Sequence, residues 1–119
     1  MKICMAQINT LVGDIAGNAR RILEVSVAQR DQGATMVVFP ELTLTGYPPE
    51  DLLLRHDLMV RTDAAVARLC EQLPAELAVV IGYPKLRGET LFNSAGVIYQ
   101  GSLMAVSYTH LTLPTICSV

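Results

Sequence analysis

Apolar residues recur along the chain in two patterns that alternate, short runs and longer helical stripes. The short runs predict strands over residues 2–8, 36–39, 77–82, 90–99 and 102–105. The stripes predict amphipathic helices over residues 18–32 and 57–73. A strand, a helix and a strand in this order predict a parallel βαβ unit. The fold class is therefore α/β, or a mixed sheet with helices packed against it.

Both predicted helices carry residues that favour helix ends. Asn18 is the expected N-cap of the first helix, and Gly33 is expected just after its last turn. Pro74 ends the second helix, because proline cannot continue a helix. The apolar stripe of the first helix comprises Ala19, Ile22, Leu23 and Val27, and that of the second comprises Leu58, Thr62, Ala65, Leu69 and Leu73.

Prolines mark the ends of two predicted strands. The run over residues 36–39 stops at Pro40, and Glu41 follows at once. The run over residues 77–82 is expected to stop in the same way at Gly82-Tyr83-Pro84. Because open α/β sheets bind ligands at the carboxyl ends of their strands, Glu41 is a candidate site residue. A carboxylate in this place could equally cap a turn or pair with a surface arginine.

Composition restricts the class of protein. A chain of 119 residues with 51% hydrophobic residues is expected to form a single domain with one core. The net charge is -2 and the nine lysines and arginines do not cluster, which argues against nucleic acid or an anionic membrane as a partner. The amino terminus shows no signal peptide, and no apolar run approaches the roughly 20 residues that span a bilayer. Three cysteines are too few for a disulfide framework, so we expect reduced thiols and a cytoplasmic location.

Other chemically active residues give weaker signals. No Gly-rich phosphate-binding motif is present, and the two histidines have no spaced ligand companions, so neither a cofactor nor a metal site is predicted. Lys85 follows the second proline-marked strand end and could act in catalysis, although a solvated lysine is the commoner case. Cys4 and Cys70 fit small residues that pack against a core.

Several motifs resemble one family. Phe39-Pro40-Glu41-Leu42 followed by Thr45-Gly46-Tyr47-Pro48-Pro49-Glu50-Asp51-Leu52-Leu53 resembles the carbon–nitrogen hydrolase (nitrilase) superfamily. The second of these runs is the more specific motif, and it resembles the glutaminase domains of glutamine-dependent NAD synthetases. The same resemblance extends, in order and spacing, to Met5-Ala6-Gln7-Ile8-Asn9, Val12-Gly13-Asp14 with Gly17-Asn18, and Phe92-Asn93-Ser94-Ala95.

This resemblance implies a fold, a reaction and a set of partners. The implied fold is the αββα sandwich, and the implied site combines a Glu, a Lys and a Cys. The Cys thiolate attacks the carboxamide of glutamine, and water hydrolyses the resulting thioester. Glu41 matches the general base, and Tyr47 matches a loop residue near the glutamine pocket. The released ammonia passes to a synthetase domain that uses ATP and Mg²⁺ to convert deamido-NAD to NAD, and the full-length enzymes are expected to form homo-oligomers.

The resemblance ends near Ala105. Residues 106–119 contain no acidic residue, no Lys, no Arg and no Gly, and they resemble translated adapter sequence. We therefore predict a family domain over residues 1–105 and a non-native tail over residues 106–119, with an ordinary charge-free edge segment as the alternative. The place of the family's lysine holds Tyr108-Thr109-His110, and Cys117 comes too early to be the nucleophile.

These departures lead to a specific expectation. The chain is predicted to be a truncated sandwich, the first part of a glutaminase domain, and to be inactive alone because the catalytic Lys and Cys are missing. It is expected to hold no cofactor, since ATP and Mg²⁺ belong to the absent synthetase domain. Two alternatives stay open: a fragment of another carbon–nitrogen hydrolase, such as an amidase or a nitrilase, and a non-catalytic assembly module.

Overall fold

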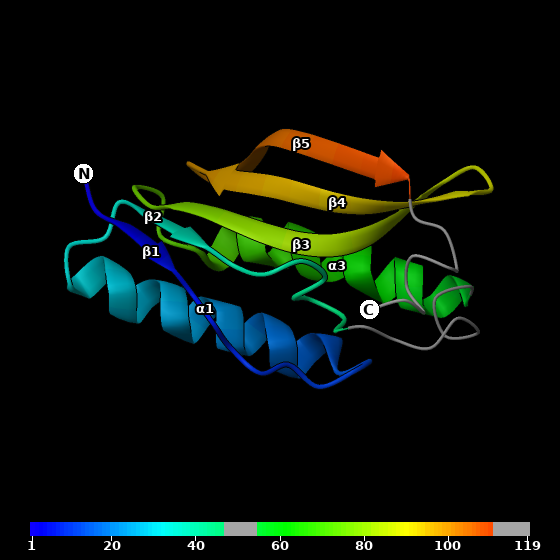
Figure 1. Cartoon of the computed structure of the whole chain (residues 1–119), viewed down its shortest axis with the longest axis horizontal. Helices are drawn as coiled ribbons and strands as arrows, with labels where there is room; N and C mark the ends of the chain where they lie inside the picture. Colours follow the sequence, from blue (N-terminus) through cyan, green and yellow to red (C-terminus); the bar gives the residue numbers. More distant parts are fainter. Residues whose placement is uncertain (47–54, 111–119) are drawn as a thin grey trace.

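The computed structural model describes residues 1–46 and 55–110, which form a five-stranded mixed sheet and two long helices (Figure 1). The strands lie in the sheet in chain order. Their bounds are Ile3–Met5 for β1, Met36–Val38 for β2, Ala78–Arg87 for β3, Thr90–Tyr99 for β4 and Ser102–His110 for β5. The helices are α1, Ile15–Asp31, and α3, His56–Gln72. The predicted mixed α/β class is confirmed.

The first three strands are parallel, as the βαβ pattern predicts. Cys4 of β1 lies opposite Val37 of β2, and Val37 lies opposite Val79 of β3. Val37 and Val79 are completely buried because this face of the sheet carries the helices. β1 is shorter than predicted and ends at Met5, although the backbone N–H of Ala6 still donates to the carbonyl of Val38 at 2.9 Å.

The last three strands are antiparallel and are joined by tight turns. β4 has the predicted bounds, and a two-residue turn at Gln100 and Gly101 leads into β5. Both turn residues have positive φ, 51° and 79°, which matches the twist of a hairpin. β5 runs to His110, beyond the predicted end at residue 105. The predicted change of origin after residue 105 stays a prediction, because strand pairing reports geometry and not the source of a segment.

The predicted end of β3 at Gly82 is wrong. The strand continues through Tyr83 and Pro84 to Arg87, and Pro84 lies opposite Asn93 of β4. The pairing of β3 with β2 ends at Val80, so beyond this point β3 has a partner strand on one side only. Proline is tolerated at such an edge because no ladder hydrogen bond is lost there.

The predicted N-cap of the first helix is also wrong. α1 begins at Ile15, and Asp14 is the cap, with its carboxylate accepting a hydrogen bond from the N–H of Gly17 at 3.1 Å. Asn18 lies inside the helix and is buried. Ile22, from the predicted stripe, is completely buried, whereas Leu23 is only partly so.

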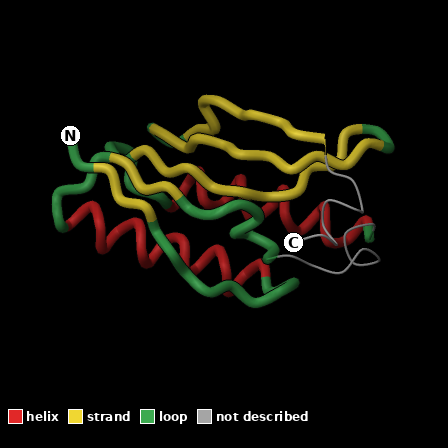
Figure 2. Tube along the Cα trace, in the orientation of Figure 1, coloured by secondary structure: helices red, strands yellow, loops and turns green. Residues whose placement is uncertain are grey.

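Both helices lie on the same side of the sheet (Figure 2). The apolar stripe predicted for α3 is confirmed. A hydrophobic core forms between this helix, α1 and the sheet. On the other face of the sheet, Ile3 and Met5 remain 52% and 71% exposed. In the described part of the chain, neither helix is long and apolar enough to cross a membrane.

Candidate functional site

Glu41 lies just past the carboxyl end of β2, as predicted from the apolar run and Pro40. The N–H of Phe39 still donates to the carbonyl of Val80 at 2.9 Å, but Pro40 has no N–H to continue the ladder. Glu41 is exposed, whereas the four residues that follow it are almost completely buried. The carboxylate therefore stands on a buried turn.

This turn is held by hydrogen bonds at both ends. The N–H of Gly46 donates to the carbonyl of Leu42 at 2.8 Å, and the Thr43 hydroxyl donates to the carbonyl of Pro40. Leu42 has a φ of 52°, a left-handed conformation that costs on the order of 1–3 kcal/mol in a branched residue. Such strain persists only where the surroundings determine the backbone closely, so Glu41 is carried by a well-defined segment.

Gly82 of β3 makes room for the turn. A Cβ atom at Gly82 would lie 2.5 Å from the backbone nitrogen of Leu42 and 2.8 Å from the carbonyl oxygen of Pro40. Both atoms belong to the backbone and cannot rotate away. The N–H of Leu44 also donates to the carbonyl of Gly82 at 3.1 Å. Because Gly82 has no side chain, the backbone of Pro40, Glu41 and Leu42 can pass directly over β3.

Asn18 anchors the other side of the turn, a role that was not predicted from the sequence. Its Nδ2 donates to the carbonyls of Leu11 at 2.8 Å and Leu44 at 3.0 Å, and its Oδ1 accepts from the N–H of Leu11 at 3.0 Å. A polar residue on the helical stripe between Ile15 and Ile22 was the signal that could have indicated this buried contact.

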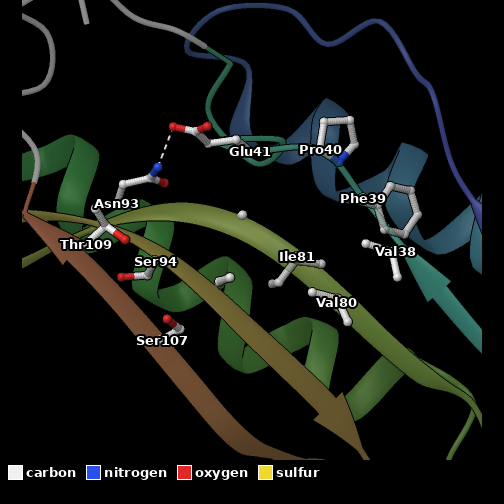
Figure 3. Close-up of a pocket in the computed structure, with 12 residues that line it drawn as sticks. Val38, Phe39, Pro40, Glu41, Val80, Ile81, Asn93, Ser94, Ser107 and Thr109 are labelled. Atoms are coloured by element: carbon white, nitrogen blue, oxygen red, sulfur yellow. Dashed lines mark hydrogen bonds between the residues drawn. The ribbon is translucent and has the colours of Figure 1, made fainter. Parts of the chain in front are cut away.

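A cavity of about 310 Å³ opens beside Glu41 on the sheet face away from the helices (Figure 3). Residues of β2, β3, β4 and β5 line this cavity, and its apolar part includes Val38, Val80 and Ala95. Asn93 of β4 points toward Glu41 and donates from Nδ2 to Oε1. Asn93 belongs to the Phe92-Asn93-Ser94-Ala95 motif, but this contact was not predicted from the sequence.

A second cavity of about 260 Å³ borders Glu41 on the side of the first loop. Polar residues of this loop and of the turn, Asn9, Thr10 and Thr43, contribute to its wall. Because Glu41 borders both cavities, its carboxylate is open to small molecules from more than one direction.

Lys85 does not belong to this site. It follows Tyr83 on the helix-covered face of β3, and its Nζ lies 3.2 Å from Oδ1 of Asp63 on α3. The lysine is about one-third exposed, so the commoner reading, a lysine partly in solvent, fits its position.

The described cysteines also lie away from Glu41. Cys4 and Cys70 pack against the core, as predicted. Burial, followed by the charge of Glu71, raises the pKa of the Cys70 thiol, which is the opposite of what a nucleophilic thiolate needs. Among residues 1–46 and 55–110, no cluster of His, Cys, Asp and Glu could hold a metal ion.

Two predicted features fall outside the described residues. These are Tyr47, the expected residue of the substrate pocket, and Cys117. Of the predicted catalytic groups, the described structure contains Glu41. An exposed carboxylate with one oxygen held by an amide can accept and return a proton, which is the chemistry of a general base.

The fold and this site define a class of protein. The chain belongs to the carbon-nitrogen hydrolase family, and the match to the family covers residues 2–118. The glutamine-dependent NAD(+) synthetase of Xanthomonas campestris is 40% identical over 115 residues, and the homologous enzyme of Xylella fastidiosa is 41% identical over 104 residues. These matches cover 96% and 87% of this chain but 20% and 19% of the relatives, so the chain spans about a fifth of their length.

Solved structures agree with this assignment. The glutamine-dependent NAD+ synthetase of Acinetobacter baumannii superposes with a TM-score of 0.83 at 33% identity, over 92% of this chain and 20% of that one. An amidase from Nesterenkonia sp. superposes with a TM-score of 0.79 at 24% identity, over 92% of this chain and 42% of the amidase, and shows the shared fold. The nitrilase-type fold predicted from the motifs is confirmed.

Proposed function

We propose that this chain forms the part of a glutamine-hydrolysing site that carries the general base, within a glutamine-dependent NAD(+) synthetase. The relatives that bear this name support the proposal, and so does the run around Gly46 in the sequence. The observation that carries it is the placement of Glu41, an exposed carboxylate on a buried turn, with one oxygen held by Asn93 at a cavity.

In the proposed reaction, Glu41 moves protons while other groups form bonds. It takes the proton of a cysteine thiol as the sulfur attacks the carboxamide carbon of glutamine, and it returns that proton to the leaving ammonia. It then takes a proton from the water that attacks the thioester, which yields glutamate and the free thiol. The thiol, and a lysine that stabilises the oxyanion, would come from a part of the enzyme other than the described residues.

The remaining elements of the proposal concern the whole enzyme. Tyr47 contacts glutamine, and the ammonia passes to a synthetase domain, where ATP and Mg²⁺ are used to convert deamido-NAD to NAD. The full-length protein is a cytoplasmic homo-oligomer. This chain alone releases no ammonia from glutamine, since neither described cysteine, Cys4 or Cys70, borders the cavities at Glu41.

A chimera tests the proposal. Residues 1–105 of this chain replace the matching segment of the Xanthomonas campestris synthetase, and ammonia release from glutamine is measured. We expect activity in the chimera, and a loss of about 10²–10⁴-fold after Glu41→Gln, because the amide cannot take up a proton. Glu89→Gln, in the exposed turn between β3 and β4, is the matched control and should leave the rate unchanged.

Three results would contradict the proposal. The first is an inactive chimera, and the second is a Glu41→Gln chimera as active as its parent. The third is hydrolysis of simple amides without hydrolysis of glutamine, which would favour another carbon–nitrogen hydrolase. Ammonia release by the isolated chain that disappears after Glu41→Gln would contradict the expectation that the chain alone is inactive.

A further inference from the structure

The side chain of Glu41 depends on a partner that lies 52 residues away in the sequence. The turn fixes the backbone of Glu41, but its side chain is exposed and has three rotatable bonds beyond that backbone. A free glutamate side chain samples many rotamers, and only some of them direct a carboxylate oxygen into the cavity. The hydrogen bond from Asn93 restricts this freedom.

Strand pairing brings Asn93 to the right face of the sheet. Asn93 lies opposite Pro84, and Ala95 lies opposite Gly82, so these four residues share the face that borders the cavity. Gly82 lets the turn approach β3 closely, and the next strand, β4, then presents Asn93 to Glu41 (Figure 3). Two neighbouring strands therefore place the backbone and the carboxylate of the same residue.

The chemistry of an asparagine suits this task. A carboxylate can only accept hydrogen bonds, so the amide nitrogen of Asn93 is the atom that must face it. The amide is neutral and does not titrate, so it orients the carboxylate without forming an ion pair with it. None of the ion pairs formed within residues 1–46 and 55–110 includes Glu41.

We propose that Asn93 is a positioning residue that holds Oε1 of Glu41 and thereby leaves Oε2 as the oxygen that exchanges protons with the reacting groups. This inference rests on the proposed function only in taking Glu41 as the base. The contact itself and its effect on the reaction can be tested separately.

The contact is tested in the 119-residue chain by NMR spectroscopy of the Asn93 side-chain amide. We expect its two proton signals to shift when Glu41→Ala removes the acceptor, and to stay in place after the control Glu89→Ala. Asn93 signals that are the same in the parent and in Glu41→Ala, with the rest of the spectrum preserved, would overturn the proposal.

The effect on the reaction is tested in the chimera by measuring kcat and KM separately. Asn93→Ala should lower kcat by about 10–100-fold, the scale expected when a catalytic group is misplaced by about 1 Å, with a much smaller change in KM. Asn93→Asp keeps the shape but removes the donor and adds a repelling charge, so it should lose at least as much. Asn93→Gln keeps the donor and should recover part of the rate.

The outcomes separate the two proposals. If Asn93→Ala keeps the parent kcat, or if Asn93→Asp is as active as the parent, the positioning role is wrong and Asn93 only fills space. If the parent chimera is inactive, or Glu41→Gln leaves its rate unchanged, the proposed function fails, while the NMR measurement still decides whether Asn93 holds Glu41. Asn93→Asp is nearly isosteric, so it keeps the test decisive if Asn93→Ala does not fold.

Discussion

Two short segments of this chain have the same local sequence pattern but adopt different structures. Phe39-Pro40-Glu41 and Tyr83-Pro84-Lys85 each place an aromatic residue, a proline and a charged residue in a row after an apolar run. In the first segment the strand ends and the charged residue enters a cavity. In the second the strand continues for three more residues, and the charged residue faces a helix.

The difference comes from the neighbouring strands. β2 lies between β1 and β3 and pairs with both over the same three residues, so a proline can follow it but cannot extend it. β3 has lost its partner β2 when it reaches Pro84 and keeps only β4. Whether a proline ends a strand therefore depends on whether a backbone N–H is needed at its position, and this is decided by strands far away in the sequence.

The position relative to the strand also decides the chemistry of the charged residue. Glu41 lies beyond its strand and is free of the alternation between the two faces, so the turn can aim it into the cavity. Lys85 lies within β3 and must follow the alternation, which places it on the helix-covered face beside Asp63.

The largest expected effect distinguishes these two charged residues directly. In the chimera, Glu41→Gln should lower the rate of ammonia release by about 10²–10⁴-fold, whereas Lys85→Met should change it by less than about twofold. Side-by-side rate measurements would check this contrast. A large loss with Lys85→Met would mean that the second segment also serves the reaction.

The second effect concerns Tyr83, which is 3% exposed beneath α3. Burial, and then the nearby Tyr108, Asp63 and Cys70, raise the pKa of Tyr83 from 10.0 to about 12. The folded state therefore releases the Tyr83 proton at a higher pH than the unfolded state. The contribution of this group to the free energy of unfolding is complete below pH 10 and is lost as the pH rises from 10 to about 12. The two-unit difference corresponds to about 2–3 kcal/mol.

Urea unfolding at several pH values should show this loss in the parent chain and a smaller one in Tyr83→Phe, which has no proton to lose. The difference between the two curves removes the contributions of other groups that titrate in the same range. Parallel curves from pH 9 to 12 would show that the hydroxyl of Tyr83 is not buried in solution.

A third prediction compares two glycines that both lie within strands. A Cβ at Gly82 would meet backbone atoms of the turn, whereas a Cβ at Gly96 would meet the flexible end of Leu103 at 2.8 Å and the ring of Tyr83. Gly82→Ala should therefore lower the free energy of unfolding by about 1–3 kcal/mol, and Gly96→Ala should lower it by a smaller amount. Urea unfolding measures both, and equal costs would mean that the turn moves away from β3 easily.

The smallest expected effect is that of the ion pair between Lys85 and Asp63. Both side chains are partly in solvent, so Asp63→Asn should change the free energy of unfolding by less than about 1 kcal/mol. The effect should shrink further at high salt, because exposed charges are screened. A loss well above this range in urea unfolding would give Lys85 a larger structural role than the geometry indicates.

The sequence was sufficient to predict the structural features that depend on local periodicity. The stripe of α3, the bounds of β4 and the place of Glu41 at a strand end follow from residue spacing alone. The remaining features depend on distant partners. Asn18 looks like a cap in sequence because asparagine favours caps, yet it satisfies the carbonyl of Leu44, 26 residues away.

The role of Asn93 was hidden for the same reason. Its acceptor, Glu41, lies 52 residues away in the sequence, and the pairing of β3 with β4 brings the two residues together. A hydrogen-bond partner supplied by a distant strand is therefore harder to predict than a charged residue at a strand end, which the proline already indicates.

The turn that carries Glu41 also has a consequence for folding order. Its contacts come from α1 through Asn18, from β3 through Gly82 and from β4 through Asn93. Closing such long loops costs chain entropy before the contacts can stabilise them, so contacts of this kind form late during folding. The position of the Glu41 carboxylate should thus be fixed only when the helices and the sheet have assembled, and a half-folded chain would leave this carboxylate unplaced.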